Sequence, residues 1–226
     1  MFALLVILTA GAAPGLFWMW YVYKKDVFEP EPLSLVTKAF FCGALSTIPA
    51  LVLEIIFGFD GTFSLIVVAP VVEECIKCFV VVFFFLKNKE VNEPLDILIY
   101  ATAVALGFAT IENLGYLLTA AVRGNLPQVA FLRALLSVPG HFLFSTIWAL
   151  GLALQFVNTT PRRPALSLYL GASILAHAAF NTIAAFAPFG GLLFILIMAL
   201  LWLRFHRSVR LLLGISPFKT KEKGEA

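Results

Sequence analysis

The chain has 226 residues, of which 61% are hydrophobic and 13% are charged, and its formal net charge at pH 7 is +3. A composition this apolar excludes an ordinary soluble domain and indicates a polytopic membrane protein. The small net charge gives no reason to expect a nucleic-acid partner, and the lipid bilayer is the surrounding that the composition predicts.

Apolar stretches recur along the chain, each long enough to cross ~30 Å of hydrocarbon, which takes roughly 20 helical residues. Helices are the expected form, because a backbone in lipid must satisfy its own hydrogen bonds and no stretch alternates like a barrel strand. We predict seven membrane-spanning helices, over residues 2–23, 33–57, 62–86, 95–121, 129–157, 165–187 and 189–205. The fold class is therefore an all-α membrane helix bundle, with one transmembrane domain over 1–210 and a short basic tail over 211–226.

The first stretch is interpreted as a membrane helix and not as a secretory signal. No basic residue precedes its apolar run, and Pro14 would disturb a cleavage site.

Basic residues gather in the loops that a chain of seven helices places on one side of the membrane. They are Lys24, Lys25, Lys87, Lys89, Arg162, Arg163, Arg204, Arg207, Arg210, Lys219, Lys221 and Lys223. The opposite loops carry only Arg123. The positive-inside rule then places the N-terminus outside the cell and the C-terminus in the cytoplasm.

Polar side chains interrupt four of the predicted helices. They are Glu73, Glu74 and Lys77 in the third helix, Glu112 in the fourth, His141 in the fifth, and His177 with Asn181 in the sixth. A charge at the centre of a membrane helix costs roughly 2.5 to 3.5 kcal/mol on insertion scales and normally faces the bundle interior. Because these groups lie at similar depth, slightly toward the outer face, we expect one polar chamber.

Spacing within each helix indicates which of these groups can cooperate. Glu73 and Lys77 are four residues apart and can pair, and His177 and Asn181 have the same relation. Glu74 points about 100° away from Glu73 on a helical wheel. Only Glu73 is therefore expected to share a face with Lys77, and the two glutamates are expected to have different roles.

Two prolines lie just before polar residues of this set. Pro70 precedes Glu73, and Pro139 precedes His141. A proline inside a membrane helix is tolerated where protein or water satisfies the freed backbone groups. These interruptions also indicate a cavity.

Four other side chains in the helices are interpreted as structural. Glu54 and Arg133 lie near the outer ends of their helices, where a long side chain reaches the interface at little cost, and the two can pair. Cys75 and Cys78 form a CxxC motif, but as helical neighbours inside a membrane they are interpreted as packing residues rather than a redox or metal site.

Histidines, carboxylates and an asparagine are the groups of a hydrolytic site that activates water. In a metal-free design a glutamate takes a proton from water, while His177 and Asn181 stabilise the oxyanion of an attacked amide. In a metal design Zn²⁺ is held by His141, His177 and a glutamate, assigned as Glu112, and a second glutamate transfers protons. Both designs stay open, although three carboxylates against one lysine favour the metal.

Two other classes of function fit an intramembrane polar cluster. Acids and histidines also form the proton relays of proton- or ion-coupled transporters, and a non-catalytic membrane scaffold is a third class. The small size of the chain and the lack of an inverted repeat speak against a transporter.

The polar residues fall into four ordered motifs. EECIK at 73–77 fits EExxK, FATIEN at 108–113 fits FxxxEN, His141 stands alone in the next helix, and HAAFN at 177–181 fits HxxxN. With APG at 13–15 and DVFEPEP at 26–32, these motifs closely resemble the PrsW family of bacterial intramembrane proteases. That family is distantly related to the CAAX prenyl endopeptidases, and the resemblance runs from about residue 10 to residue 205.

The resemblance implies that the 1–210 domain is a cell-membrane protease. Such an enzyme makes the first, extracytoplasmic-side cut in a single-pass anti-sigma factor, which leads to a stress response. The motifs assign catalytic roles to Glu73, Glu74, Glu112, His141, His177 and Asn181, with Lys77, Phe108 and Asn113 as supporting residues.

Two departures from related patterns bear on the metal. The prenyl endopeptidases have FxxxH where this chain runs from Phe108 to Glu112, and some PrsW-like chains have aspartate in place of Asn181. Both departures leave the choice between the two designs open.

Overall fold

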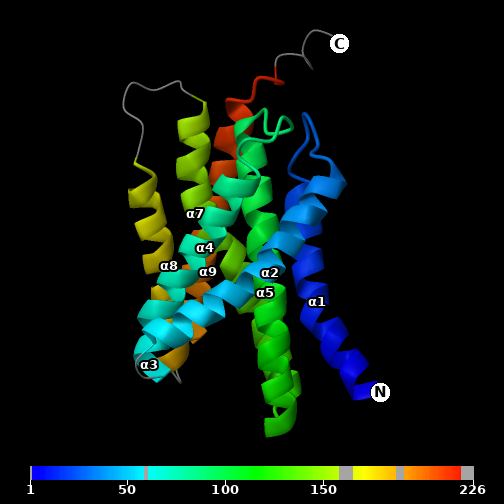
Figure 1. The fold of residues 1–226 in the computed structure, drawn as a ribbon, viewed down its shortest axis with the longest axis vertical. Helices are drawn as coiled ribbons and strands as arrows, with labels where there is room; N and C mark the ends of the chain where they lie inside the picture. Colours follow the sequence, from blue (N-terminus) through cyan, green and yellow to red (C-terminus); the bar gives the residue numbers. More distant parts are fainter. Residues whose placement is uncertain (1, 59–60, 158–164, 187–190, 220–226) are drawn as a thin grey trace.

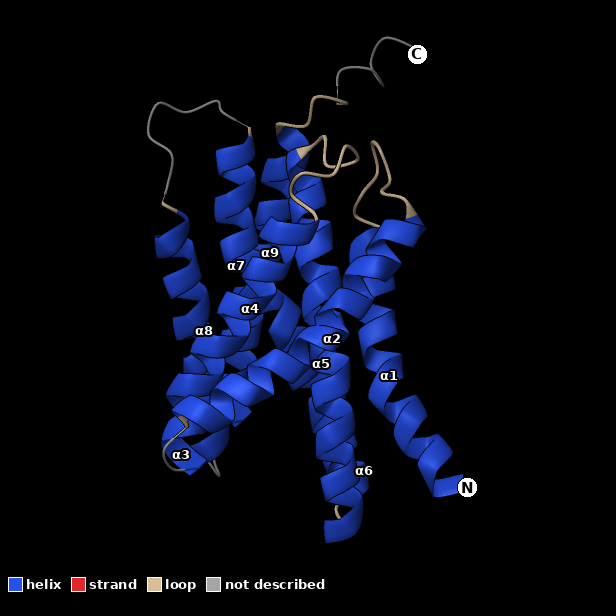
Figure 2. Cartoon of the chain, viewed as in Figure 1, coloured by secondary structure: helices blue, strands red, loops and turns tan. Residues whose placement is uncertain are grey.

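The computed structural model describes residues 2–58, 61–157, 165–186 and 191–219, and every regular element in these ranges is a helix (Figure 2). The α-helices are α1 (Phe2–Tyr23), α2 (Leu33–Phe57), α3 (Gly61–Phe63), α4 (Ala69–Phe84), α5 (Pro94–Arg123), α6 (Leu126–Leu132), α7 (Val138–Phe156), α8 (Leu166–Phe186) and α9 (Gly191–Gly214). Two π-helical turns, η1 (Ser64–Val68) and η2 (Arg133–Ser137), join α3 to α4 and α6 to α7.

The described helices follow the predicted membrane segments. Six of them are long and apolar enough to cross a membrane: Leu4–Tyr23, Leu33–Phe57, Pro94–Arg123, Leu126–Phe156, Leu166–Phe186 and Gly191–Gly214. The predicted third segment is also helical, from Gly61 to Phe84, but it is not among these six, because Glu73, Glu74 and Lys77 lie close together near its middle. The all-α membrane bundle is therefore confirmed, and the chain is a multi-pass membrane protein.

Different chain segments lie at the two ends of the bundle (Figure 1). The N-terminus and the end of α5 at Arg123 lie at one end, and loops 24–32 and 85–93 and the residues after α9 lie at the other. The predicted basic residues Arg162, Arg163, Lys221 and Lys223, and the predicted segment ends at 187 and 189, lie outside the described residues. The membrane orientation and the division at residue 210 stay predictions, and α9 runs on to Gly214.

Helix α5 forms the centre of the bundle, and α2 crosses it obliquely (Figure 1). At the crossing the two backbones touch. A Cβ atom on Gly43 would lie 1.9 Å from the carbonyl oxygen of Val104, and one on Gly107 would lie 1.8 Å from that of Phe40. Glycine at both positions lets the helices approach this closely.

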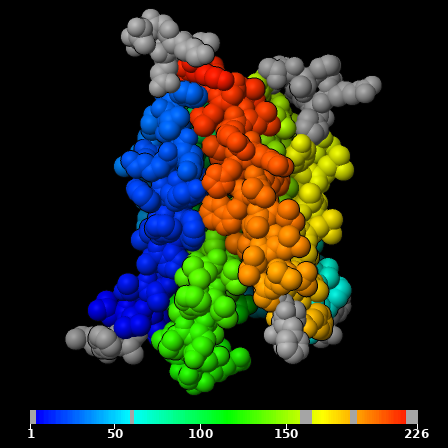
Figure 3. All heavy atoms as spheres, turned by 180° about the vertical axis from the view of Figure 1, so that it is seen from behind, coloured from blue at the N-terminus to red at the C-terminus, as the bar shows by residue number. Residues whose placement is uncertain are grey.

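Helix α9 covers the opposite face of the bundle, between α1 and α8 (Figure 3). Its aromatic side chains pack on α7, where the rings of Trp202 and Phe205 lie 5.6 and 5.7 Å from the ring of Phe142. Edge-to-face contacts of this kind add to the stability that burial provides.

The two prolines before the polar residues follow the two π-helical turns. Pro70 lies two residues after the end of η1, and Pro139 two residues after the end of η2. A wide turn accommodates the missing N–H group of a proline, and such turns are frequent at functional sites. Each helix is therefore widened rather than broken, and Glu73 and His141 follow within one turn.

Each π-helical turn has a backbone carbonyl that the following proline cannot bond. In this register Pro70 would donate to the carbonyl of Leu65, and Pro139 to that of Ala134, but proline has no N–H. Side chains of other helices donate instead. The Asn181 Nδ2 lies 2.9 Å from the Leu65 oxygen, and the Trp18 Nε1 lies 3.5 Å from the Ala134 oxygen. These bonds fix α8 and α1 against the two turns.

Candidate active site

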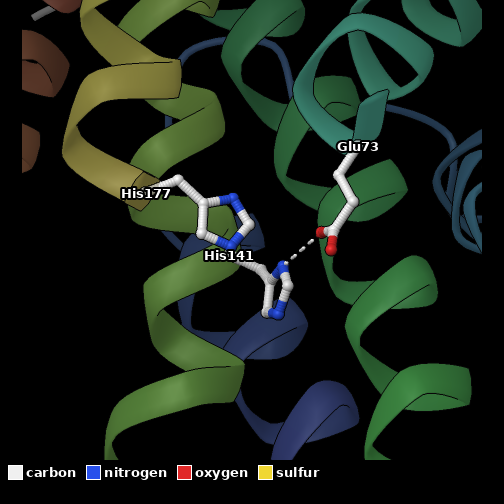
Figure 4. A group of neighbouring side chains, drawn as sticks. All are labelled: Glu73, His141 and His177. Carbon is white, nitrogen blue, oxygen red and sulfur yellow. Dashed lines mark ion pairs between the residues drawn. The ribbon is translucent and has the colours of Figure 1, made fainter. Parts of the chain in front are cut away.

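Three buried side chains from three helices meet in the bundle interior (Figure 4). Glu73 comes from α4, His141 from α7 and His177 from α8, and one ligand atom from each lies within 4.8 Å of the others. The His141 Nδ1 is 3.5 Å from the Glu73 Oε2. The depth argument therefore predicted correctly that residues far apart in sequence come together.

A hollow of about 460 Å³ opens beside this group, and we call it the chamber. The predicted site residues that line it are Glu73, Glu112, His141, His177 and Asn181. Glu54, Tyr116 and Arg133 line it as well, although the sequence interpretation did not place them there.

Lys77 lies at the centre of the charged contacts in α4. Its Nζ is 3.0 Å from the Glu73 Oε2, 3.0 Å from the Glu74 Oε1 and 3.1 Å from the His141 Nδ1. It also lies 4.4 Å from the centre of the Phe108 ring. The Glu73–Lys77 pair is confirmed. The expectation that Glu74 is turned away from Lys77 was wrong, because residues three apart on a helix are also neighbours.

Glu74 is fully buried, and both of its carboxylate oxygens are occupied. The Oε1 accepts from Lys77 and lies 3.3 Å from the His177 Nδ1; the Oε2 accepts from Ser145 at 2.8 Å, Trp148 at 3.1 Å and Ser173 at 3.1 Å. With this many donors around it, Glu74 orients His177 and Lys77 and does not line the chamber. Glu73, by contrast, lines the chamber.

The two serines were missed from the sequence, although their spacing marks them. Ser145 lies four residues after His141, and Ser173 lies four residues before His177, so each shares a helix face with a site histidine. A hydroxyl at such a position can reach the same carboxylate as its histidine neighbour. Trp148 has no comparable spacing and is identified by the structure alone.

Glu112 and Asn113 of α5 hold the side chain of Arg133. The Arg133 Nη2 lies 2.5 Å from the Glu112 Oε2, and the Arg133 Nε donates to the Asn113 Oδ1 at 2.9 Å. The His141 Nε2 contacts the same Glu112 oxygen at 2.9 Å.

The predicted Glu54–Arg133 pair was therefore wrong, because Arg133 pairs with Glu112. Arg133 and His141 are eight residues apart, a spacing that would leave their side chains about 80° apart around a regular α-helix. The π-helical turn between them takes up one extra residue, so both side chains reach α5.

Glu54 of α2 is the carboxylate of the chamber that takes part in no ion pair within the described part of the chain. It reaches the chamber because α2 lies obliquely across α4 and α5 (Figure 1). A helix tilt of this kind is not encoded in the spacing of residues, so the sequence interpretation treated Glu54 as a residue of the helix end.

An apolar groove meets the chamber at Glu73. The groove has a volume of about 690 Å³ and runs between α2 and α5, from Glu73 to Arg123 at the end of α5. Its apolar lining includes Ile48, Leu51, Ile111 and Val129, and it shares Glu54, Glu73, Glu112 and Tyr116 with the chamber. The polar chamber is thus continuous with a surface suited to an apolar chain.

The donor set fits a metal ion of the zinc type. Two imidazoles and one carboxylate are the protein ligands of many catalytic zinc sites. The group comprises Glu73, His141 and His177, whereas the sequence assigned Glu112 as the carboxylate. Glu112 instead contacts the far nitrogen of His141, in the way that carboxylates orient ligating histidines.

The charges of the site also fit a divalent cation. Four carboxylates face two cationic side chains here: Glu54, Glu73, Glu74 and Glu112, against Lys77 and Arg133. With neutral histidines, two negative charges are left over, which is the charge that a divalent ion would balance.

The chain is similar to proteins of one family. The profile of a family described as "PrsW family intramembrane metalloprotease" matches residues 31–204. Three curated relatives are each named Protease PrsW. The one from Geobacillus kaustophilus is 39% identical over 146 residues, which cover 62% of this chain and 63% of the relative. The one from Oceanobacillus iheyensis is 33% identical over 206 residues, covering 88% and 93%, and the one from Bacillus subtilis is 32% identical over 184 residues, covering 78% and 82%.

No solved structure matches the chain at a significant level. The family match covers the four helices that carry Glu73, Glu112, His141 and His177. The chain therefore belongs to the PrsW family of intramembrane proteases of the cell membrane.

Proposed function

We propose that the chain cuts a peptide bond of a single-pass membrane protein near the outer face of the membrane, with Glu73, His141 and His177 at the centre of the site. The observation that carries the proposal is the position of Glu73, where the polar chamber meets the apolar groove. A substrate segment lying in the groove would bring its backbone beside Glu73 and the two histidines.

We assign Zn²⁺ as the metal and Glu73, His141 and His177 as the residues that would hold it. A metal ion bound there would supply a Lewis acid that polarises the scissile carbonyl and makes water nucleophilic at neutral pH. Glu112 orients His141, and Glu74 orients His177, so that each imidazole keeps a fixed direction. In this arrangement Lys77 offsets part of the negative charge of Glu73 and Glu74.

Proton transfer is assigned to Glu54. Glu112 is held by an arginine and Glu74 by several donors, so neither is free to accept a proton readily. Glu54 lines the chamber and the groove alike, so it can take a proton from the attacking water and return it to the leaving nitrogen.

The proposed substrate is a membrane-anchored anti-sigma factor, as the resemblance to the PrsW family implies. The apolar lining of the groove suits a membrane-spanning segment. The groove reaches Arg123 at the end of α5 that the positive-inside rule places outside, which agrees with a cut on the extracytoplasmic side.

The test is cleavage of a single-pass substrate co-reconstituted with the purified chain in proteoliposomes. Both variants, Glu73→Ala and His177→Ala, should insert into the membrane normally and abolish cleavage, because each lacks one of the three side chains proposed to hold the metal. Cys75→Ala is the matched control, since Cys75 lies on the same helix as Glu73 but on its exposed side, and it should cleave at the wild-type rate. Full cleavage by Glu73→Ala, or pH-dependent solute flux without proteolysis, would contradict the proposal.

A further inference from the structure

A second group of acids lies far from the chamber, at the end of the bundle that carries loops 24–32 and 85–93. Asp26, Glu31, Glu93 and Asp96 are 4%, 1%, 0% and 0% exposed. We call these four residues the acidic cluster. Asp96 and Glu112 are sixteen residues apart on α5, or roughly 24 Å along the helix axis, so the cluster is separate from the active site.

All four acids share one pattern of hydrogen bonding, in which one carboxylate oxygen is held by the protein. The Glu31 Oε2 accepts from the Tyr100 hydroxyl. The Asp26 Oδ2 accepts from the Glu31 backbone N–H at 2.9 Å; the Asp96 Oδ2 accepts from the Asn92 and Glu93 backbone N–H groups at 2.8 Å each; and the Glu93 Oε2 accepts from the Ser216 hydroxyl. These bonds fix the direction of each carboxylate before any ligand arrives.

The second oxygen of each of the four acids is buried and has no hydrogen-bond partner. The atoms are the Asp26 Oδ1, the Glu31 Oε1, the Glu93 Oε1 and the Asp96 Oδ1. One carboxylate oxygen from each of Asp26, Glu93 and Asp96 lies within 4.8 Å of the others. A buried acceptor without a donor is costly, and a cation held between the carboxylates would remove this cost.

No basic side chain supplies that charge. Among the residues that the structure describes, none of the four acids takes part in an ion pair with lysine, arginine or histidine. No basic side chain in the described part of the chain therefore offsets the charge that these carboxylates carry when they are ionised.

We propose that Asp26, Glu93 and Asp96 bind a hard divalent cation, Ca²⁺ or Mg²⁺, in a site distinct from the active site. A set of ligands made only of carboxylate oxygens suits these ions, whereas zinc prefers nitrogen and sulfur. The donors that hold the Asp26 Oδ2, the Glu93 Oε2 and the Asp96 Oδ2 orient the ligands, as second-layer groups do in metal sites. Glu31, held by the Tyr100 hydroxyl, adds a fourth negative charge beside them.

A cation there would join segments that are distant in sequence. Asp26 belongs to the connection between α1 and α2, and Glu93 and Asp96 to the start of α5. Ser216, which bonds Glu93, follows α9. The expected consequence is a more stable end of the bundle rather than a change in the chemistry of the chamber.

The test measures thermal unfolding of the full-length protein in detergent micelles, after treatment with EDTA and then with added CaCl₂ or MgCl₂. At saturation the wild type should gain about 5 °C in Tm. The double variant Asp26→Asn/Glu93→Gln should lose this gain, because amides keep the size of the side chains but bind the cation weakly. The variant should still fold, because a neutral amide is less costly to bury than a charged carboxylate.

Two controls separate the cluster from its surroundings. Glu29→Gln removes a nearby charge from the same loop and should keep the gain in Tm. The His141→Ala/His177→Ala variant should also keep it, because its change lies in the chamber. The proposal is overturned if the wild type does not respond to either cation, if the Asp26→Asn/Glu93→Gln variant responds as the wild type does, or if the histidine variant loses the response. A failure here leaves cleavage by the wild type intact, so it is distinguishable from failure of the proposed protease.

Discussion

At the scale of single residues, the adjacent acids Glu73 and Glu74 differ in their access to the chamber. Both contact Lys77, but Glu73 lines the chamber and the groove, whereas Glu74 is also enclosed by hydroxyl, indole and imidazole groups. A carboxylate with this many hydrogen-bond donors around it is suited to fixing the direction of its neighbours, here His177 and Lys77. We therefore assign metal binding to Glu73 and the positioning of His177 and Lys77 to Glu74.

This assignment predicts different effects for two isosteric substitutions. Glu73→Gln should abolish cleavage and lower the Tm by less than Glu74→Gln does, because fewer hydrogen-bond donors surround Glu73. Glu74→Gln should cost about 3 kcal/mol or more of folding stability, because it leaves the buried Lys77 and His177 with one partner fewer. Thermal unfolding and substrate cleavage of both variants check the prediction, and a Glu74→Gln protein with wild-type Tm would contradict it.

Glu54 is the residue whose role the structure changes most, since its helix position indicated a structural residue. If it transfers protons, Glu54→Gln should lower the rate of cleavage by about 100-fold or more. The metal content should stay unchanged, because Glu54 is not part of the group of ligands. Cleavage rate and metal content measured on the same preparation test this; an unaffected rate would return Glu54 to a structural role.

At the scale of helices, the two π-helical turns determine which side chains enter the chamber. Each turn precedes a proline, and each shifts the following helix by one residue relative to a regular α-helix. The shift brings Arg133 to Glu112 and lets Asn181 bond the freed carbonyl of Leu65. Asn181 thus contributes to the site at least in part by holding α8 against η1.

The crossing of α2 and α5 sets the tilt that brings Glu54 to the chamber. Gly43→Ala should destabilise the bundle by about 1 to 3 kcal/mol, because the new methyl group collides with the backbone of α5. Gly115→Ala, on α5 itself but with no atom within 4 Å of the added carbon, is the matched control and should be neutral or slightly stabilising. Equal Tm values for the two variants would mean that the crossing does not constrain the bundle.

At the scale of the whole molecule, hydropathy was enough to predict the helices. Depth in the membrane was enough to predict that one chamber is lined by Glu73, Glu112, His141, His177 and Asn181. Both follow from one-dimensional periodicity, since an apolar run of the right length must cross the bilayer and a polar group within it must face inward. The partner of Arg133 and the place of Glu54 could not be predicted in this way. They depend on a one-residue shift in a turn and on a helix tilt, which only the packed bundle fixes.

The acidic cluster illustrates the same limit in the loops. Asp26 and Asp96 are seventy residues apart, and each resembles an ordinary polar residue at a membrane boundary. Only the packing of α1 and α5 brings them together with Glu93. Helix α5 thereby connects two polar centres, one that we assign to catalysis and one that we assign to stability.

The central claim is that Glu73, His141 and His177 hold a catalytic zinc ion. The most direct test is the metal content of the purified protein, measured by elemental mass spectrometry for the wild type and for His141→Ala/His177→Ala. The account predicts about one zinc ion per chain in the wild type. It predicts almost none in the double variant, because that variant lacks two of the three proposed zinc ligands. Wild-type protein that cleaves its substrate while containing no more zinc than the double variant would contradict it.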